Sequence, residues 1–478
     1  MSPEQENSTV LPTEEDIVPA DEGAAVPPRR VDLTHGSLLR GIVLLSWPIV
    51  ASAFLQWVMG AADIKMVGYL GPAAIAAVGT SRGAIMTLMA IIFAISTGTQ
   101  VLVARYTGER DAHAVAGVTR QALILSVLAG IAMMPLGWWL SQHMLAALGA
   151  EGEVLRLGTL YTQVYFIGAI GLMINFMLTA ALNGAGDTLT PLYLLLGINT
   201  GHVLLEWLLI FGGGPVPALG VAGAAWAVVA SRGVGAIILL WIISSGRFAI
   251  NMPLRNGWGI DLSVWWKTFY IGIPSSIQGF TRNLAYLMLL WILNQTVAGR
   301  LAVAGYIICG QIQMVGLMVG LALMSAAMTA VGQNLGAGSP ERAERSGWTV
   351  MRISVVAVAG MAAVFILSAR YLIGFFTTDP QATHWGVVSL HILSAVLPFT
   401  AAGMAFSGAL RGAGDTLSPL WASLLTTSGL GPGLAYVFTI TLGYGPTGAW
   451  FGLALSVIVQ ALIIGWIFKR GKWKTIEL

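Results

Sequence analysis

The feature that most constrains this fold is a near-continuous succession of apolar segments. Runs of roughly 20 apolar residues, the length that crosses a bilayer as a helix, follow one another from Leu38 to Phe468. Only 9% of the 478 residues are charged, whereas about 25% are charged in ordinary soluble domains. Backbone groups in hydrocarbon must find their hydrogen bonds inside the protein. The sequence therefore predicts an all-α integral membrane protein with twelve transmembrane helices.

The two halves of the chain repeat each other. The phrase Ala-Leu-Asn-Gly-Ala-Gly-Asp-Thr-Leu-Thr-Pro-Leu at residues 181–192 returns at 409–420 as Ala-Leu-Arg-Gly-Ala-Gly-Asp-Thr-Leu-Ser-Pro-Leu. Pro48 and Pro274 recur at nearly the same offset. Repeated lobes are typical of transporters that open alternately to the two sides of a membrane. We predict two pseudo-symmetric six-helix lobes, with each phrase at a turn between two spans.

The expected division of the chain follows from a long polar connection between the sixth and seventh spans. The expected spans are 40–69, 73–103, 116–142, 154–182, 189–213, 219–245, 266–294, 300–333, 347–374, 384–409, 416–443 and 446–468. The expected parts are a disordered cytoplasmic tail 1–37, an N-terminal lobe 38–245, a cytoplasmic connection 246–265, a C-terminal lobe 266–468 and a cytoplasmic tail 469–478. The first tail lacks the basic start and short apolar core of a signal peptide.

The distribution of Lys and Arg predicts the orientation. With both termini cytoplasmic, seventeen basic residues lie on the inside, four (Lys65, Arg156, Arg300 and Arg370) lie outside, and Arg82, Arg232 and Arg282 lie within spans. Cytoplasmic loops carry the excess of Lys and Arg. We expect a multi-pass protein of the cell inner membrane with both termini in the cytoplasm.

Several classes of function are disfavoured by what the sequence contains. The single cysteine, Cys309, excludes a disulfide framework and a cysteine-based metal site. No catalytic nucleophile or metal constellation is apparent, so we expect no enzyme and no cofactor. We expect a small-molecule substrate, contact with membrane lipid, no nucleic-acid partner and a monomer.

Two acidic residues, Asp63 and Glu206, fall well inside the expected spans, and both belong to the first lobe. An ionised carboxylate at the centre of a membrane helix costs about 2.5–3.5 kcal/mol on insertion scales, so such residues usually mark an ion or substrate pathway. His202 precedes Glu206 by four positions and shares its helix face. Burial and mutual repulsion favour retention of a proton by such a pair. We expect cation coupling at Asp63, Glu206 and His202, with H⁺ favoured and Na⁺ held by the two carboxylates as the alternative.

A structural alternative stays open for each carboxylate. Arg82 lies at a depth similar to that of Asp63, so the two could form an ion pair without a role in transport. Arg232 could do the same for Glu206. The sequence does not decide between Arg82 and Glu206 as the partner of Asp63.

Further polar residues in the expected spans are candidates for a substrate cavity, because polar groups in lipid must find partners. They are Gln56, Asn175, Asn199, Gln278, Arg282, Asn283 and Tyr165. Helix-to-helix hydrogen bonding is the alternative role for each of them.

The combination of these motifs resembles the multidrug and toxic compound extrusion (MATE) family. The resemblance covers about residues 38–468. It rests on the first span with Trp47-Pro48, Gln56 and the run Gly60–Gly71, on the doubled Gly-Ala-Gly-Asp-Thr phrase, and on Val331–Gly338. It implies twelve spans in two lobes and export of organic cations and other amphiphiles in exchange for H⁺ or Na⁺.

The resemblance also suggests a branch. The family's first-span carboxylate matches Asp63, while positions that carry acids in the NorM-like branch match Arg282 and about Thr400 here. The DinF-like branch pairs the first-span Asp with an Asn-x-x-x-Asp in span five, which reads His202-Val-Leu-Leu-Glu206 here. The resemblance therefore implies a DinF-like ion site with His in place of Asn and Glu in place of Asp.

These observations predict a cation-coupled multidrug efflux antiporter of the inner membrane. One rival is a flippase for lipid-linked saccharides, which would need a strongly basic cavity. The other is a membrane receptor or scaffold with no transport cycle, which the repeated lobes and the buried acids disfavour.

Overall fold

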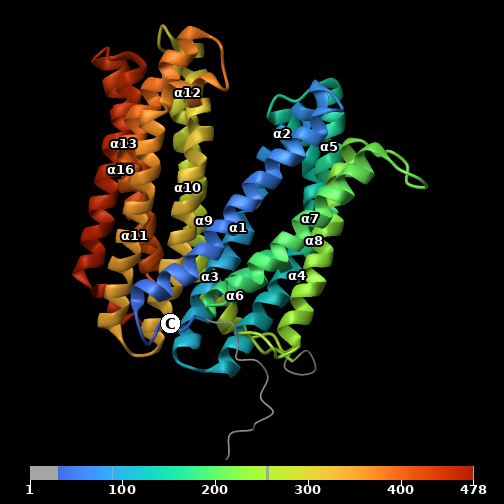
Figure 1. The fold of residues 1–478 in the computed structure, drawn as a ribbon, viewed down its shortest axis with the longest axis vertical. Coiled ribbons are helices and arrows are strands. Elements are labelled where there is room, and N and C mark those ends of the chain that lie inside the picture. The colour runs from blue at the N-terminus through green and yellow to red at the C-terminus, as the bar shows by residue number, and fades with distance from the viewer. Residues whose placement is uncertain (1–30, 89, 254–257, 477–478) are drawn as a thin grey trace, which may run out of the picture.

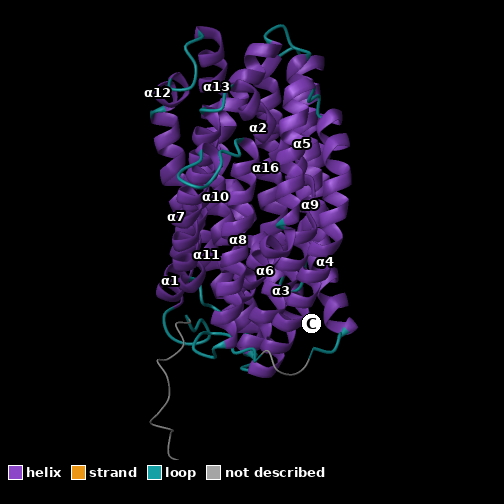
Figure 2. Cartoon of the chain, turned by 90° about the vertical axis from the view of Figure 1, so that its right-hand side faces the viewer, coloured by secondary structure: helices purple, strands orange, loops and turns teal. Residues whose placement is uncertain are grey.

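The computed structural model describes residues 31–88, 90–253 and 258–476. Within these ranges the chain is helical, apart from connecting loops and one isolated β-bridge between Gly213 and Val216 (Figure 2). Most of the expected tail 1–37, and Arg29, Arg30 and Arg255 of the orientation argument, lie outside the described residues.

The first half of the chain forms eight helices. They are α1 (Leu38–Gly68), α2 (Pro72–Leu88), α3 (Ala90–Gly108), α4 (Ala112–Ala147), α5 (Gly152–Ile167), α6 (Ala169–Gly184), α7 (Leu189–Phe211) and α8 (Val221–Ser244). The second half contains α9 (Leu262–Asn294), α10 (Gly299–Gly336), α11 (Pro340–Leu367), α12 (Ala369–Gly374), α13 (Pro380–Gly412), α14 (Leu417–Ser423), η2 (Leu424–Leu430), α15 (Gly431–Tyr436), η3 (Val437–Thr441), α16 (Gly445–Arg470) and η4 (Lys472–Thr475).

These helices build the twelve expected spans. Eight single helices of the described chain are long and apolar enough to cross a membrane, and two bent pairs act as one span each: α2 with α3, across residue 89, and α5 with α6. The α5–α6 pair bends by 57° at Gly168, where an added Cβ would collide with Val229. Helix α9 and the continuous helical run 417–441 supply the remaining two spans.

The eleventh span differs from the plain helix expected over 416–443. It alternates between α-helix and π-helix, with π segments η2 and η3 on either side of α15. Pro432 lies at the start of α15 and has no backbone N–H to donate. Wider π turns accommodate such interruptions and are frequent at functional sites.

Acidic side chains outside the membrane core mostly cap helices. Asp111, Asp261 and Asp379 accept hydrogen bonds from backbone N–H groups in the first turns of α4, α9 and α13. Asp415 accepts from Ser418 N at 3.0 Å, at the start of α14. Carboxylates accept hydrogen bonds from otherwise unpaired N–H groups at helix starts, so these acids stabilise the ends of spans.

The two halves of the chain form two lobes that meet at one end and diverge at the other (Figure 1). Helix α1 crosses between them: it packs against α10 and α11 of the second lobe and against α7 and α2 of the first. The C-terminal end and the start of α1 lie at the end where the lobes meet (Figure 1). We call the side where the lobes meet the closed side and the side where they diverge the open side (Figure 1).

Reciprocal contacts show the pseudo-two-fold relation between the lobes. Gly108 packs against the carbonyl oxygen of Gln333, and Gly336 packs against that of Arg105. Gly336 lies 228 positions after Gly108, and Gln333 lies 228 positions after Arg105. In a two-fold arrangement residue i contacts j and the equivalent of j contacts the equivalent of i. The sequence repeat thus corresponds to a symmetry of the fold.

Hydrogen bonds also join the lobes where they meet. Gln100 Nε2 donates to Ser325 Oγ at 2.7 Å and to Thr329 Oγ1 at 3.1 Å. Gln333 Nε2 donates to Gly184 O at 3.0 Å. Val31 N donates to Gly186 O at 3.0 Å in the first lobe, while Arg342 Nε of the second lobe donates to Leu33 O at 3.0 Å. The segment just before α1 therefore bridges both lobes on their closed side.

Candidate functional site

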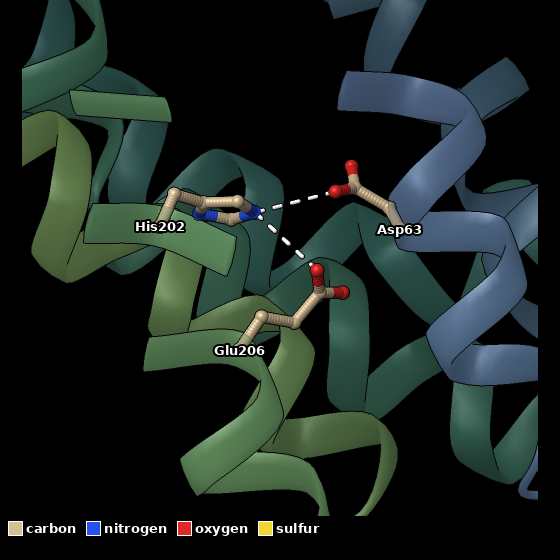
Figure 3. A group of neighbouring side chains, drawn as sticks. All are labelled: Asp63, His202 and Glu206. Atoms are coloured by element: carbon tan, nitrogen blue, oxygen red, sulfur yellow. Dashed lines mark hydrogen bonds and ion pairs between the residues drawn. The ribbon is translucent and has the colours of Figure 1, made fainter. Parts of the chain in front are cut away.

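The candidate site lies between α1, α2 and α7 in the first lobe. Asp63 projects from α1, and His202 and Glu206 project from successive turns of α7 (Figure 3). His202 and Glu206 are almost completely buried, at 4% and 1% exposure, and the Asp63 side chain is 18% exposed. The spacing of four positions on α7 places the histidine and the glutamate on one helix face.

The imidazole of His202 stands between the two carboxylates. Its Nε2 lies 3.3 Å from Asp63 Oδ1 and 3.6 Å from Glu206 Oε2 (Figure 3). The ligand atoms of the three side chains lie within 4.8 Å of one another. The structure therefore brings together the three residues that the sequence singled out, on two different helices.

Asp63 also pairs with Arg82. Arg82 Nη2 donates to Asp63 Oδ2 at 3.2 Å and to Gly60 O at 3.3 Å. Of the two partners that the sequence left as alternatives for Asp63, Arg82 pairs with Oδ2. Glu206 lies nearby, with the ligand atoms of the group within 4.8 Å of one another, while His202 faces Oδ1. The expected alternative for Glu206 differs, because within the described residues Arg232 forms no ion pair with it; the Arg232 backbone oxygen instead accepts from Asn175.

The second nitrogen of His202 is held by Ser231 of α8, with Nδ1 3.1 Å from Ser231 Oγ. The Ser231 hydroxyl donates to Val228 O at 3.1 Å, so it accepts the Nδ1 proton of the ring. Nε2 then faces both carboxylates. The sequence analysis missed Ser231, since a single serine in an apolar helix carries no signal of its own.

One oxygen of this group lacks a hydrogen-bond donor. Glu206 Oε2 is fully buried and accepts no hydrogen bond from any described residue. His202 Nε2, at 3.6 Å, is too far away for a hydrogen bond, and a buried charged oxygen without a hydrogen bond is strongly unfavourable. A cation bound between Asp63 and Glu206, whether a proton or a metal ion, removes that penalty. The donor set of two carboxylates and one imidazole is able to hold either.

Two cavities adjoin α1. The larger, of about 500 Å³, has an apolar lining that includes Trp47, Phe54 and Trp57 of α1 and Met318 and Ile353 of α10 and α11. The smaller, of about 190 Å³, is lined by residues of α1, α6, α10 and the start of α7, and half of them are polar. Its lining is Ile49, Ser52, Ala53, Gln56, Thr179, Asn183, Thr188, Pro191, Leu321 and Ala322.

The expected cavity residues of the first lobe take different places. Gln56 lines the smaller cavity. Asn175 bonds Gly171 O at 2.9 Å and Arg232 O at 2.5 Å, which ties α6 to α8. Asn199 is 8% exposed and its Nδ2 has no partner among the described residues. Tyr165 is partly buried and stacks on Tyr161 with ring centroids 6.4 Å apart.

The expected residues of the second lobe lie on α9. Gln278 Nε2 donates to Pro419 O at 3.1 Å, and its Oε1 accepts from Arg411. Arg282 and Asn283 are accessible. Arg411, which the orientation argument counted among cytoplasmic charges, is 8% exposed at the end of α13. The repeat could have indicated that Arg411 is buried, because Arg411 aligns with Asn183 of the first copy.

The chain matches the family model described as MatE over residues 48–208 and 274–437. It is 28% identical over 441 residues to the probable multidrug resistance protein NorM of Thermotoga maritima, which covers 91% of this chain and 92% of that protein. It is 24% identical to the multidrug resistance protein PmpM of Pseudomonas aeruginosa, over 89% of this chain and 90% of that protein.

The fold matches that of solved transporters. A transporter of the MOP superfamily from Pyrococcus furiosus superimposes with a TM-score of 0.87 at 24% identity, covering 94% of this chain and 99% of that one. Its description reports reverse polarity of the binding pocket and suggests a different function. An outward-facing MATE family transporter matches with a TM-score of 0.85 over 92% of this chain.

Proposed function

Since the chain belongs to the MatE family of multi-pass membrane transporters, and is accordingly a transporter and not an enzyme, we propose that it exports organic cations or amphiphilic compounds by antiport. Relatives that align along nine tenths of the chain are named multidrug resistance proteins. In this proposal the outward movement of the compound is driven by a cation that moves inward.

The observation that carries the proposal is the buried group of Asp63, His202 and Glu206. It places two carboxylates around one imidazole, and one buried carboxylate oxygen lacks a donor. A cation on this group neutralises negative charge that is otherwise costly at a buried position in a membrane helix. Binding and release of the cation then changes the relative energy of the two lobe arrangements, which is what any coupled transporter requires.

The chemistry of the donors favours H⁺ over Na⁺ as the coupling ion. Hard cations select oxygen ligands, whereas the centre of this group is an imidazole nitrogen, which binds a proton readily and is a poor ligand for Na⁺. Asp63, His202 and Glu206 can share protons without an added ligand. The site follows the DinF-like pattern, with the second carboxylate on the fifth span, and Na⁺ between Asp63 and Glu206 is the alternative.

The orientation of the chain in the membrane determines the direction in which the compound is transported. We assign the chain ends, the connection 246–265 and the tails to the cytoplasm of an inner membrane, because most Lys and Arg residues lie on that side. The lobes 38–245 and 266–468 then diverge toward the outside. A monomer surrounded by lipid suffices for this cycle, since the group and both cavities are built within one chain.

Transport by reconstituted protein tests the proposal. Proteoliposomes loaded with a panel of fluorescent organic cations are given an imposed H⁺ or Na⁺ gradient, and efflux is recorded. Asp63→Asn should abolish gradient-driven efflux, because a neutral amide cannot bind the driving proton. Glu206→Asp, which keeps the charge on a shorter side chain, should retain part of it.

The matched control is Glu153→Gln, which also removes one acidic charge from the first lobe. The Glu153 side chain is 66% exposed and pairs only loosely with Arg156, at 4.0 Å, so normal efflux is expected. Efflux by Asp63→Asn at the rate of the wild type would refute the coupling role of this group.

A further inference from the structure

The second lobe carries two arginines, Arg282 and Arg411, at positions where the first lobe carries the neutral side chains of Gln56 and Asn183. Arg411 at the end of α13 is 8% exposed, donates from Nη2 to Gln278 Oε1 and places Nη1 3.8 Å from Met324 Sδ. Its Nε has no partner among the described residues. Within the described residues, the buried Arg411 guanidinium therefore contacts one amide oxygen and one sulfur atom but no carboxylate.

Arg282 adds a second guanidinium one turn further along α9. It shares a face of α9 with Gln278, Ala285 and Leu289, as their spacing of three, four and seven positions requires. Ala285 and Leu289 are buried, so this face packs into the lobe, yet Arg282 itself stays accessible. Gln278, one turn before Arg282 on this face, contacts Arg411, which places the two arginines in the same part of the lobe.

The chain supplies no acid to neutralise the two arginines. Four acidic residues lie between 262 and 476, and all stand at helix ends. Asp379 and Asp415 cap α13 and α14, Glu344 pairs with Lys474 at 2.5 Å, and Glu341 lies in the first turn of α11. Within the described residues none of them forms an ion pair with Arg282 or Arg411.

The repeat relates these second-lobe residues to residues that line a cavity in the first lobe. Gln278 and Arg282 correspond to Ser52 and Gln56, 226 positions earlier, and Arg411 corresponds to Asn183, 228 positions earlier. These three residues of the first lobe line the cavity of about 190 Å³. The same place in the fold therefore carries neutral amides in one lobe and two cations in the other.

We propose that Gln278, Arg282 and Arg411 form a subsite that binds the anionic group of an amphiphilic substrate, a carboxylate, sulfonate or phosphate. Guanidinium groups bind such anions through paired, charge-assisted hydrogen bonds. An anion would satisfy Arg411 Nε and relieve the repulsion between the two arginines. The inference deepens the proposed function: it extends the transported class from cations to zwitterionic and acidic amphiphiles.

Two dyes that differ only at a carboxyl group test the subsite. Rhodamine 110 carries a free carboxylate, and rhodamine 123 is its methyl ester. Binding of each to the purified full chain in detergent is measured by fluorescence polarisation, corrected for empty micelles. We expect the carboxylate dye to bind about tenfold more tightly, which corresponds to a difference of roughly 1.4 kcal/mol in binding free energy. Arg282→Gln and Arg411→Gln should each bring the two affinities within about twofold, with little change for the ester.

Arg300→Gln, an exposed arginine in the first turn of α10, is the matched control and should keep the preference. If Arg411→Gln does not fold, Arg282→Gln alone tests the subsite. The Arg282 side chain makes no ion pair within the described chain, so its replacement should not disturb folding. Equal affinities in the wild type, or an unchanged preference in Arg282→Gln, would overturn the proposal.

A lipid headgroup offers the same chemistry, so a competition arm separates the two sources. Phosphatidylglycerol that displaces rhodamine 110 from the wild type, while phosphatidylcholine does not, would assign the subsite to lipid and overturn its role in substrate binding. If phosphatidylglycerol does not displace rhodamine 110, the result supports a subsite for substrate.

The binding assay is an equilibrium measurement without an ion gradient, so it does not depend on antiport. Carboxylate-selective binding without driven efflux would therefore refute antiport and leave the subsite standing.

Discussion

One of the two differences from the DinF-like pattern lies at the centre of the candidate site. His202 occupies the position where an asparagine would place an amide oxygen, and its ring lies within 3.6 Å of both carboxylates. Spacing alone could predict that His202 and Glu206 share a face of α7. The approach of Asp63 from α1 could not be derived in that way, because it depends on how α1 crosses the lobe.

Replacement of His202 by Asn should change ion preference. The amide would offer an oxygen, the ligand type that hard cations prefer, and would remove the imidazole, which can bind a proton where an amide cannot. We expect efflux by His202→Asn to gain dependence on a Na⁺ gradient at constant pH and to lose most of its response to a H⁺ gradient. Proteoliposome efflux under each gradient measures this.

Thr200→Ala is the matched control, since Thr200 lies on the same helix, is exposed, and bonds only Leu196 O. It should leave ion preference unchanged. A His202→Asn variant that remains driven by H⁺ alone would show that the ring does not set the choice of ion.

At the scale of the helices, close backbone contacts seal one side of the molecule. Gly272 of α9 packs directly on the Ala94 carbonyl of α3, and Gly98 of α3 packs on that of Thr268. Small residues let membrane helices approach in this way. The sequence shows abundant glycine but not which glycines meet across the lobes, because pairing depends on tertiary arrangement.

Gly272→Ala should therefore weaken the closed side. The added Cβ would collide with backbone, and such overpacking costs about 1–3 kcal/mol, which shifts a two-state equilibrium roughly 5- to 150-fold. We expect a cysteine at Ser325, in a Cys309→Ser background, to react faster with a membrane-impermeant maleimide from the side of the chain ends.

Gly279→Ala on the same helix is the control, because nothing lies within 4 Å of the added atom. It should leave the labelling rate unchanged. Equal rates in Gly272→Ala and Gly279→Ala would mean that this contact does not stabilise the closed side.

For the whole molecule, the apolar segments and the repeat were enough to predict twelve spans in two lobes. They did not predict the π turns of the eleventh span or the burial of Arg411. Those features depend on how Pro432 and the end of α13 pack against neighbouring helices, which neither hydropathy nor spacing encodes.

The central claim is that protons on Asp63, His202 and Glu206 control the lobe arrangement, and distances across the open side test it most directly. Spin labels are placed through Arg156→Cys and Tyr371→Cys in a Cys309→Ser background. Both native side chains are exposed, at 70% and 84%, in the parts of the lobes that diverge. The distances are read by double electron–electron resonance.

Protonation removes negative charge from the buried group, which lowers the cost of enclosing it when the lobes close on the open side. Acidic pH should therefore shift the wild type toward shorter distances, while Asp63→Asn should give one distribution at acidic and neutral pH. An Asp63→Asn variant that keeps the full pH response of the wild type would contradict the account.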